Sequence, residues 1–137
     1  MFGTTTNPAQ AYSSVSIETS IQNASPHKLI LLLFEGAHEA IVIARAGMEE
    51  GDIPKKGMSI TKAIDIILNG LRASLNLEEG GEIAQNLYAL YDYMAGRLLH
   101  ANMHNDRGAL NEVLGLLTDI QGAWASIGDE GGQPAKA

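Results

Sequence analysis

The feature that most constrains the fold of this chain is a helical repeat of apolar residues that recurs in four consecutive stretches. Apolar residues return every three or four positions, which places them on one face of an α-helix. The stretches cover residues 26–50, 55–76, 82–105 and 107–128, and short links rich in Gly, Pro, Asn and Asp join them. Long helices with short links pack beside one another in opposite directions. The sequence therefore predicts an all-α fold, an antiparallel four-helix bundle.

Residues with capping chemistry mark three of the helix ends. Ser25 followed by Pro26 is a strong start signal, because the serine hydroxyl accepts an orphan N–H and proline has no N–H to leave unpaired. Gly51 is placed to end the first helix in the left-handed conformation. Asp106 is a plausible N-cap for the last helix. Residues 76–81, with two glycines and two acids, are expected to form a loop.

The bundle domain is expected over residues 25–127, between two segments of different character. Residues 1–24 are rich in Ser, Thr, Asn and Gln, and Glu18 is their only charged side chain. They form a flexible N-terminal arm in this interpretation, and both a frayed terminus and an arm that docks on the domain stay open. Residues 128–137 contain three glycines and a proline and are expected to form a disordered C-terminal tail.

Composition excludes several classes of partner and site. The chain has 9 basic and 16 acidic residues and a formal charge of −7, which argues against nucleic acid and anionic membranes as main partners. It has no cysteine, so a disulfide scaffold and a thiolate metal site are excluded. The longest strongly apolar run, residues 29–34, is far too short for stable insertion into a membrane. Residues 1–27 lack the Lys or Arg of a signal peptide, which favours a cytosolic domain.

Two of the expected helices carry more apolar surface than one core stripe requires. The stripe expected to face the core in residues 82–105 is Ile83, Leu87, Leu90, Met94 and Ala101. A second stripe there is Ala84, Tyr88, Tyr91, Ala95, Leu98 and Asn102. A second stripe in residues 26–50 is Leu29, Leu33, Gly36, Ala40, Ile43 and Gly47. A wide buried face and a groove for another chain's helix are both consistent with this pattern.

Four histidines raise the alternative of a metal-dependent helical-bundle enzyme. Glu35 and His38 form one Glu-x-x-His pair, the unit that di-iron bundles use twice, but the second copy is missing. His100 and His104 share a helix face without the glutamate of a zinc protease between them. A solvated helix face is the simpler interpretation of His100 and His104. The sequence shows no phosphate-binding loop and no catalytic constellation, so neither enzymatic activity nor a cofactor is expected.

Several blocks of residues, taken in their order along the chain, resemble the FliS family of flagellin-specific export chaperones over about residues 11–127. No single block of matching residues is specific to the family, but the whole set in this order is. The matching blocks are Ala11-Tyr12, Val15-Ser16-Ile17-Glu18, Ala24-Ser25-Pro26-His27-Lys28-Leu29-Ile30, Leu33-Phe34-Glu35-Gly36-Ala37, Lys62-Ala63-Ile64-Asp65-Ile66-Ile67, Gly80-Gly81-Glu82-Ile83-Ala84, Leu90-Tyr91-Asp92-Tyr93-Met94, Arg97-Leu98-Leu99-His100-Ala101-Asn102, Asn105-Asp106, Glu112-Val113 and Ala123-Trp124.

The resemblance implies a cytosolic, non-enzymatic chaperone. Its client in that family is the disordered C-terminal segment of flagellin, which folds into helices on the apolar surface of the bundle. Binding prevents premature polymerisation and keeps flagellin competent for the flagellar type III export apparatus. An anti-sigma factor is a possible second partner. In that family the N-terminal arm, with its tyrosine, lies in or beside the client groove. The resemblance therefore implies that Tyr12 lies there in this chain.

Together, the second stripes and the resemblance predict a partner-binding surface of ten residues. They are Tyr12, Leu29, Leu33, Gly36, Ala40, Tyr88, Tyr91, Ala95, Leu98 and Asn102.

Overall fold

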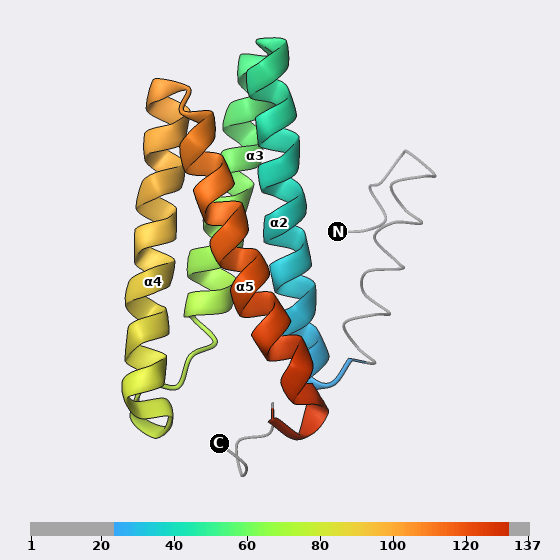
Figure 1. Ribbon diagram of the computed structural model, residues 1–137, viewed down its shortest axis with the longest axis vertical. Coiled ribbons are helices and arrows are strands. Elements are labelled where there is room, and N and C mark those ends of the chain that lie inside the picture. Colours follow the sequence, from blue (N-terminus) through green and yellow to red (C-terminus); the bar gives the residue numbers. More distant parts are fainter. Residues whose placement is uncertain (1–23, 132–137) are drawn as a thin grey trace, which may run out of the picture.

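The helices of the bundle follow one another with short links. A computed structural model describes residues 24–131, with side chains as far as Gly128. Figure 1 shows the elements in order. They are α2 (Pro26–Glu50), α3 (Ile53–Asp65), the π-helix η2 (Ile66–Arg72), α4 (Leu77–His104) and α5 (Arg107–Gly131). Because η2 continues α3 as one rod, the described residues form four helical rods, and the predicted all-α fold is confirmed.

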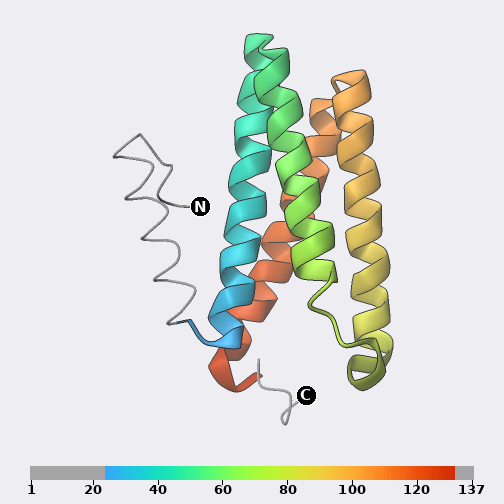
Figure 2. The same ribbon diagram turned by 180° about the vertical axis from the view of Figure 1, so that it is seen from behind.

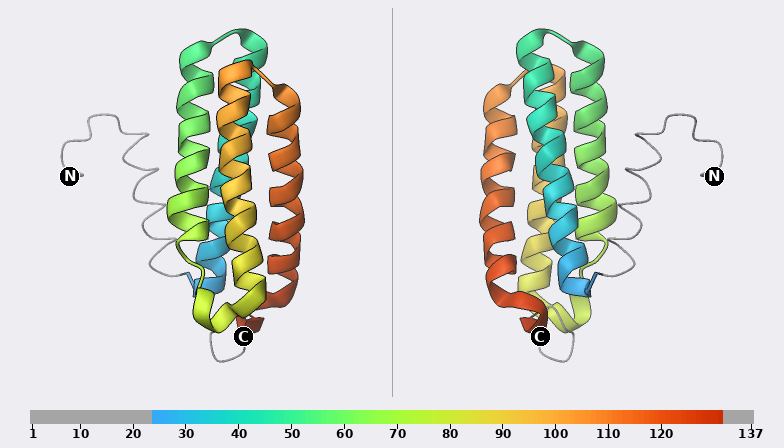
Figure 3. Two further views of the ribbon diagram at one scale, coloured as in Figure 1. Left: turned by 90° about the vertical axis from the view of Figure 1, so that its left-hand side faces the viewer. Right: turned by 90° about the vertical axis from the view of Figure 1, so that its right-hand side faces the viewer.

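Each rod packs against two neighbours. The α2 helix lies against α3 and α5, and α4 lies against the α3–η2 rod and α5. Figures 2 and 3 show α4 and α2 at opposite corners of the bundle, with successive rods running in opposite directions. This is the antiparallel arrangement that the short links predict.

The three predicted capping residues behave as expected. Ser25 Oγ accepts the Lys28 backbone N–H at 3.1 Å at the start of α2. Gly51 follows α2 with φ of 75°, a conformation that glycine adopts without a steric penalty. Asp106 Oδ1 accepts the Ala109 N–H at 3.2 Å at the start of α5.

The second rod differs from the expected helix over residues 55–76. It begins at Ile53, and it ends at Arg72 after seven residues of π-helix. Ile67 and Leu71 are both buried in this segment. Each lies in the core cluster that the four rods share. The π-helical segment thus contributes to the core along with the α-helices.

The segment 76–81 is not the loop that was expected. Asn76 Oδ1 accepts the backbone N–H groups of Glu78 and Glu79 at 3.1 and 3.0 Å, so a helical turn starts at Leu77. Gly81, with φ of 59° and ψ of −139°, breaks that turn from the rest of α4. Because Asn76 caps a helical turn that begins at Leu77, the link between η2 and α4 ends at the first residue of the segment that was predicted as a loop.

The chain segments beyond the bundle fall largely outside the described residues. Gly128, where the tail was predicted to begin, has φ of 76° and interrupts α5 three residues before its end at Gly131. Residues 1–23 of the predicted arm at 1–24, including Tyr12, and residues 132–137 of the predicted tail lie outside the described part of the chain. The predicted domain limits stay predictions.

The core runs the length of the bundle and draws on all four rods. Alanines such as Ala37 and Ala44, which are fully buried, let the rods around α2 approach closely. The largest fully buried side chains are Phe34, Ile41, Ile60, Ile67, Leu71, Met94, Leu98, Leu110, Val113 and Leu117.

Candidate partner-binding surface

The structure buries four of the ten predicted surface residues. Ala40, Tyr91, Ala95 and Leu98 are between 0% and 6% exposed. The α4 helix packs between the α3–η2 rod and α5, so a wide arc of its surface faces protein. These four residues therefore do not lie on an open face of the bundle, as a ready partner-binding surface would require. Their contact with a partner stays a prediction.

The prediction of which residues in 82–105 face the core is also only partly correct. Met94 and Ala101 are fully buried, and Leu87 and Leu90 pack against the core while remaining partly exposed. Ile83 is instead 73% exposed. The centre of the buried face of α4 therefore lies between the two stripes, a rotation that a repeat along one helix does not determine.

Leu29, Leu33 and Gly36 form the accessible edge of α2, and each is partly exposed. This edge packs on η2: a Cβ atom added to Gly70 would lie 3.1 Å from Leu33 Cδ2, and one added to Gly36 would lie 3.3 Å from Ile66 Cδ1. The small residues of the second α2 stripe thus admit the neighbouring rod. Of the two alternatives for this stripe, the packing of Leu33 and Gly36 on η2 favours a wide buried face over an open groove.

Tyr88 lies on α4 and remains 36% exposed. The guanidinium carbon of Arg72, the last residue of η2, lies 4.8 Å from the centre of the Tyr88 ring. Arg72 also forms an ion pair with Asp92 on α4. The π-helix therefore lies between the α2 edge and Tyr88 and contacts residues on both sides, although no pattern along the chain singles out Arg72.

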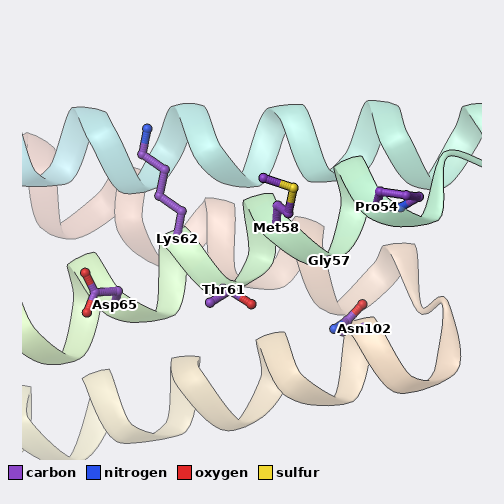
Figure 4. A pocket seen from close by; sticks show the side chains of 7 residues that line it. All are labelled: Pro54, Gly57, Met58, Thr61, Lys62, Asp65 and Asn102. Atoms are coloured by element: carbon purple, nitrogen blue, oxygen red, sulfur yellow. The ribbon is translucent and has the colours of Figure 1, made fainter. Parts of the chain in front are cut away.

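Asn102, the tenth predicted residue, lines an open hollow between α3 and α4 with a volume of about 730 Å³. Figure 4 shows that Asn102 comes from α4 and that the other lining side chains come from α3. The hollow also includes Met58, which is 74% exposed. Sequence reasoning missed Met58, although its position away from the stripe of Ile60, Ala63 and Ile67 could have indicated an exposed apolar residue. The lining residues are Pro54, Gly57, Met58, Thr61, Lys62, Asp65 and Asn102.

A buried lysine closes the end of the bundle next to this hollow. Lys56 is 7% exposed, and its Nζ donates to the Asn102 carbonyl oxygen at 3.1 Å and to Asn105 Oδ1 at 2.6 Å. Asn105 is the left-handed residue that ends α4, with φ of 50°. The C-terminal end of α4, which is the negative end of the helix dipole, also stabilises a positive charge at this position. Lys56 thus ties the start of α3 to the end of α4.

Polar side chains occupy the seam between α4 and α5. Glu112 accepts hydrogen bonds from the Tyr93 hydroxyl and, at 2.8 Å, from Arg97 Nε. The bond from Tyr93 and then the bond from Arg97 hold the pKa of Glu112 below its ordinary range. The bond to Glu112 in turn raises the pKa of Tyr93. This seam is thus an ionic surface, unlike the apolar edge of α2.

Burial, rather than a hydrogen bond, raises the pKa of Tyr91 on the core side of α4 to about 12.

The residues of the metal-enzyme alternative are not brought together. Glu35 and His38 line a hollow of about 400 Å³ with residues of α5. His100 and His104 pair with each other on α4, their ring centres 4.6 Å apart, and His100 Nε2 lies 3.0 Å from Asp106 Oδ2. Within residues 24–131, no three His, Asp or Glu side chains are grouped so as to hold a metal ion.

No described helix combines the length and hydropathy that crossing a membrane requires.

Comparison with known proteins decides the family. The family described as Flagellar protein FliS matches residues 8–131, which include every described helix. The chain belongs to the FliS family. Three FliS relatives show how far the similarity extends, and each is named a flagellar secretion chaperone FliS.

The relative from Salmonella typhimurium (strain LT2) is 53% identical over 123 residues, covering 90% of this chain and 91% of its own. The relative from Vibrio cholerae serotype O1 is 42% identical and covers 88% of both chains. The relative from Bacillus subtilis (strain 168) is 36% identical, covering 86% of this chain and 84% of its own. The FliS resemblance found in the sequence is thereby confirmed, and FliS membership identifies the chain as a flagellar secretion chaperone.

Proposed function

We propose that this chain binds the disordered C-terminal segment of flagellin in the cytoplasm, prevents its premature polymerisation and keeps it competent for the flagellar type III export apparatus. The observation that carries the proposal is the match to the FliS family over residues 8–131, together with the similarity to relatives named flagellar secretion chaperones. The partly exposed edge of α2 and the Tyr88 ring support it, because they offer apolar surface on both sides of η2. The chaperone acts by binding alone, without a catalytic step.

Binding of a disordered segment is coupled to its folding. Ordering the segment costs conformational entropy, so the contact area must be large for the complex to be stable. Apolar patches on both sides of η2 suit a client that wraps around the bundle, because each patch can hold one turn or one helix of the client. The buried residues Tyr91, Ala95 and Leu98 support this surface from beneath by fixing α4 in the core.

The test is a titration of the full chain with a flagellin C-terminal peptide, followed by calorimetry. We expect Leu29→Asp and Tyr88→Ala each to weaken peptide binding about tenfold or more, because each removes partly exposed apolar contact area. Ile83→Asp is the matched control, since Ile83 lies on α4, is 73% exposed and is outside the predicted surface. Circular dichroism checks that all three variants keep their helices.

The outcomes separate clearly. A wild-type chain that gives no heat and no complex with the peptide would contradict the proposed function. Binding that Leu29→Asp and Tyr88→Ala leave unchanged would instead contradict the placement of the surface. Further partners in this proposal are the export apparatus and an anti-sigma factor, and the same titration applies to each.

A further inference from the structure

We propose that Arg72 covers Tyr88 in the free chain and must leave its ring when the client binds. This inference rests on the proposed function and adds a regulatory contact to its binding surface. Its basis is the position of one guanidinium over one ring: Arg72 Cζ lies 4.8 Å from the ring centre of Tyr88. A cation at that distance above an aromatic face is attracted to it. The covered face is therefore not open to an apolar side chain of a partner.

The fold holds Arg72 in this position from two sides. Leu71, the residue before it, is 1% exposed in the core, which fixes the end of η2 against the bundle. Asp92, one turn along α4 from Tyr88, forms an ion pair with Arg72. Tyr88 and Asp92 are four residues apart and share a face of α4, so the ring and the carboxylate hold the guanidinium together.

The contact is weak enough to be reversible. The Arg72 and Asp92 side chains are 26% and 50% exposed, and an exposed ion pair contributes little because water screens it. A client helix that places an apolar side chain on Tyr88 can therefore displace Arg72, which then keeps its charge in water. The cost of displacement lowers the affinity of the free chain for its client, which is a modest autoinhibition.

Removal of the cover should strengthen client binding. In the peptide titration we expect Arg72→Ala to lower the dissociation constant about three- to tenfold, which is the combined loss of an exposed cation–π contact and an exposed ion pair. Asp92→Asn should give a smaller gain in the same direction, because it releases Arg72 only from the carboxylate. In a Tyr88→Ala background, Arg72→Ala should have no effect, since no ring is left to uncover.

Arg107→Ala is the matched control. It also removes one positive charge and one exposed ion pair, that of Arg107 Nη1 with Glu49 Oε2 at 2.7 Å, but at the start of α5. An equal gain in Arg107→Ala would show an effect of net charge and overturn the cover. Weaker binding of Arg72→Ala would show that Arg72 contacts the client, and unchanged binding would show that Arg72 does not compete with it. Either result overturns the proposal.

A measurement without client keeps this inference separate from the proposed function. Hydroxyl-radical labelling reports how far water reaches a side chain, and mass spectrometry assigns the label to Tyr88. We expect Tyr88 in the free chain to be labelled faster in Arg72→Ala than in the wild type, with no change in Arg107→Ala. Equal labelling in all three would overturn the cover even if the peptide binds, whereas faster labelling with no peptide binding would overturn only the proposed function.

Discussion

His27 and Trp124 bond to each other's backbone and stack their rings, although 97 residues separate them in the chain. Trp124 Nε1 donates to the His27 carbonyl oxygen at 3.0 Å, and His27 Nε2 lies 2.7 Å from the Trp124 carbonyl oxygen. Because a carbonyl only accepts, the imidazole carries a proton on Nε2. The pair joins the first turn of α2 to the last part of α5 and so closes one end of the bundle.

Trp124→Phe should weaken this closure without removing the ring. The change leaves the His27 carbonyl without the indole donor, and we expect the free energy of unfolding to fall by about 1 kcal/mol. Urea unfolding followed by circular dichroism measures it, since fluorescence would lose its only tryptophan. Tyr93→Phe, which removes an exposed hydrogen bond to Glu112, should cost less. Equal losses in both variants would contradict a special role for the pair.

Leu98→Ala should destabilise the bundle strongly. Leu98 is fully buried, so the shorter side chain leaves a cavity, and we expect a loss of about 2–5 kcal/mol in the free energy of unfolding. Leu99→Ala is the matched control, because the neighbouring leucine is 53% exposed and should change stability by about 0.5 kcal/mol or less. Chemical unfolding compares the two. If the order were reversed, the described rotation of α4 would be wrong.

Lys56→Met tests the buried ammonium at the other end of the bundle. Methionine keeps most of the apolar stem but leaves the Asn102 carbonyl and Asn105 Oδ1 without their donor, so we expect a loss of about 1–3 kcal/mol. The adjacent Lys55→Met removes a partly exposed ion pair with Glu50 and should cost about 1 kcal/mol or less. A Lys56→Met chain as stable as the wild type would show that the apolar contact outweighs these hydrogen bonds.

Two carboxylates on the α4–α5 seam should make stability depend on acidity. The bond from Tyr93 and then that from Arg97 lower the pKa of Glu112 from its ordinary 4.5, and the Ala109 N–H foremost lowers the pKa of Asp106 from 3.8. A carboxyl whose pKa is lower folded than unfolded adds stability above its unfolded pKa and loses it as the pH falls through its folded pKa. The free energy of unfolding should therefore decrease as the pH falls below about 4.5.

Urea titrations between pH 6 and about 3 measure this slope. Glu112→Gln and Asp106→Asn should each flatten it, because each removes one of the linked protons. Asp119→Asn, at an exposed position of α5, is the control and should leave the slope as in the wild type. A slope that Glu112→Gln and Asp106→Asn do not alter would place the acid sensitivity elsewhere.

Local chemistry explains why most of the fold could be predicted. Ser25, Gly51 and Asp106 are helix-end signals that depend only on neighbouring backbone, and each sits where it was expected. Leu29, Leu33 and Tyr88 are also accessible in part, as the predicted surface requires. The π-helix escaped prediction, because apolar residues four apart, such as Ile67 and Leu71, fit an ordinary α-helix equally well.

Amphipathic spacing and capping residues by themselves determined the four helical rods, because these signals act within one helix or one turn, and the short links determined that the rods are antiparallel. Tertiary structure alone decided how α4 is rotated, so that residues of both stripes are buried, such as Leu98 and Met94, while Ile83 stays exposed. It also placed Arg72 over Tyr88. The reason is geometric: a helical repeat shows which residues share a face, but only packing against neighbouring rods fixes the rotation of each helix about its own axis.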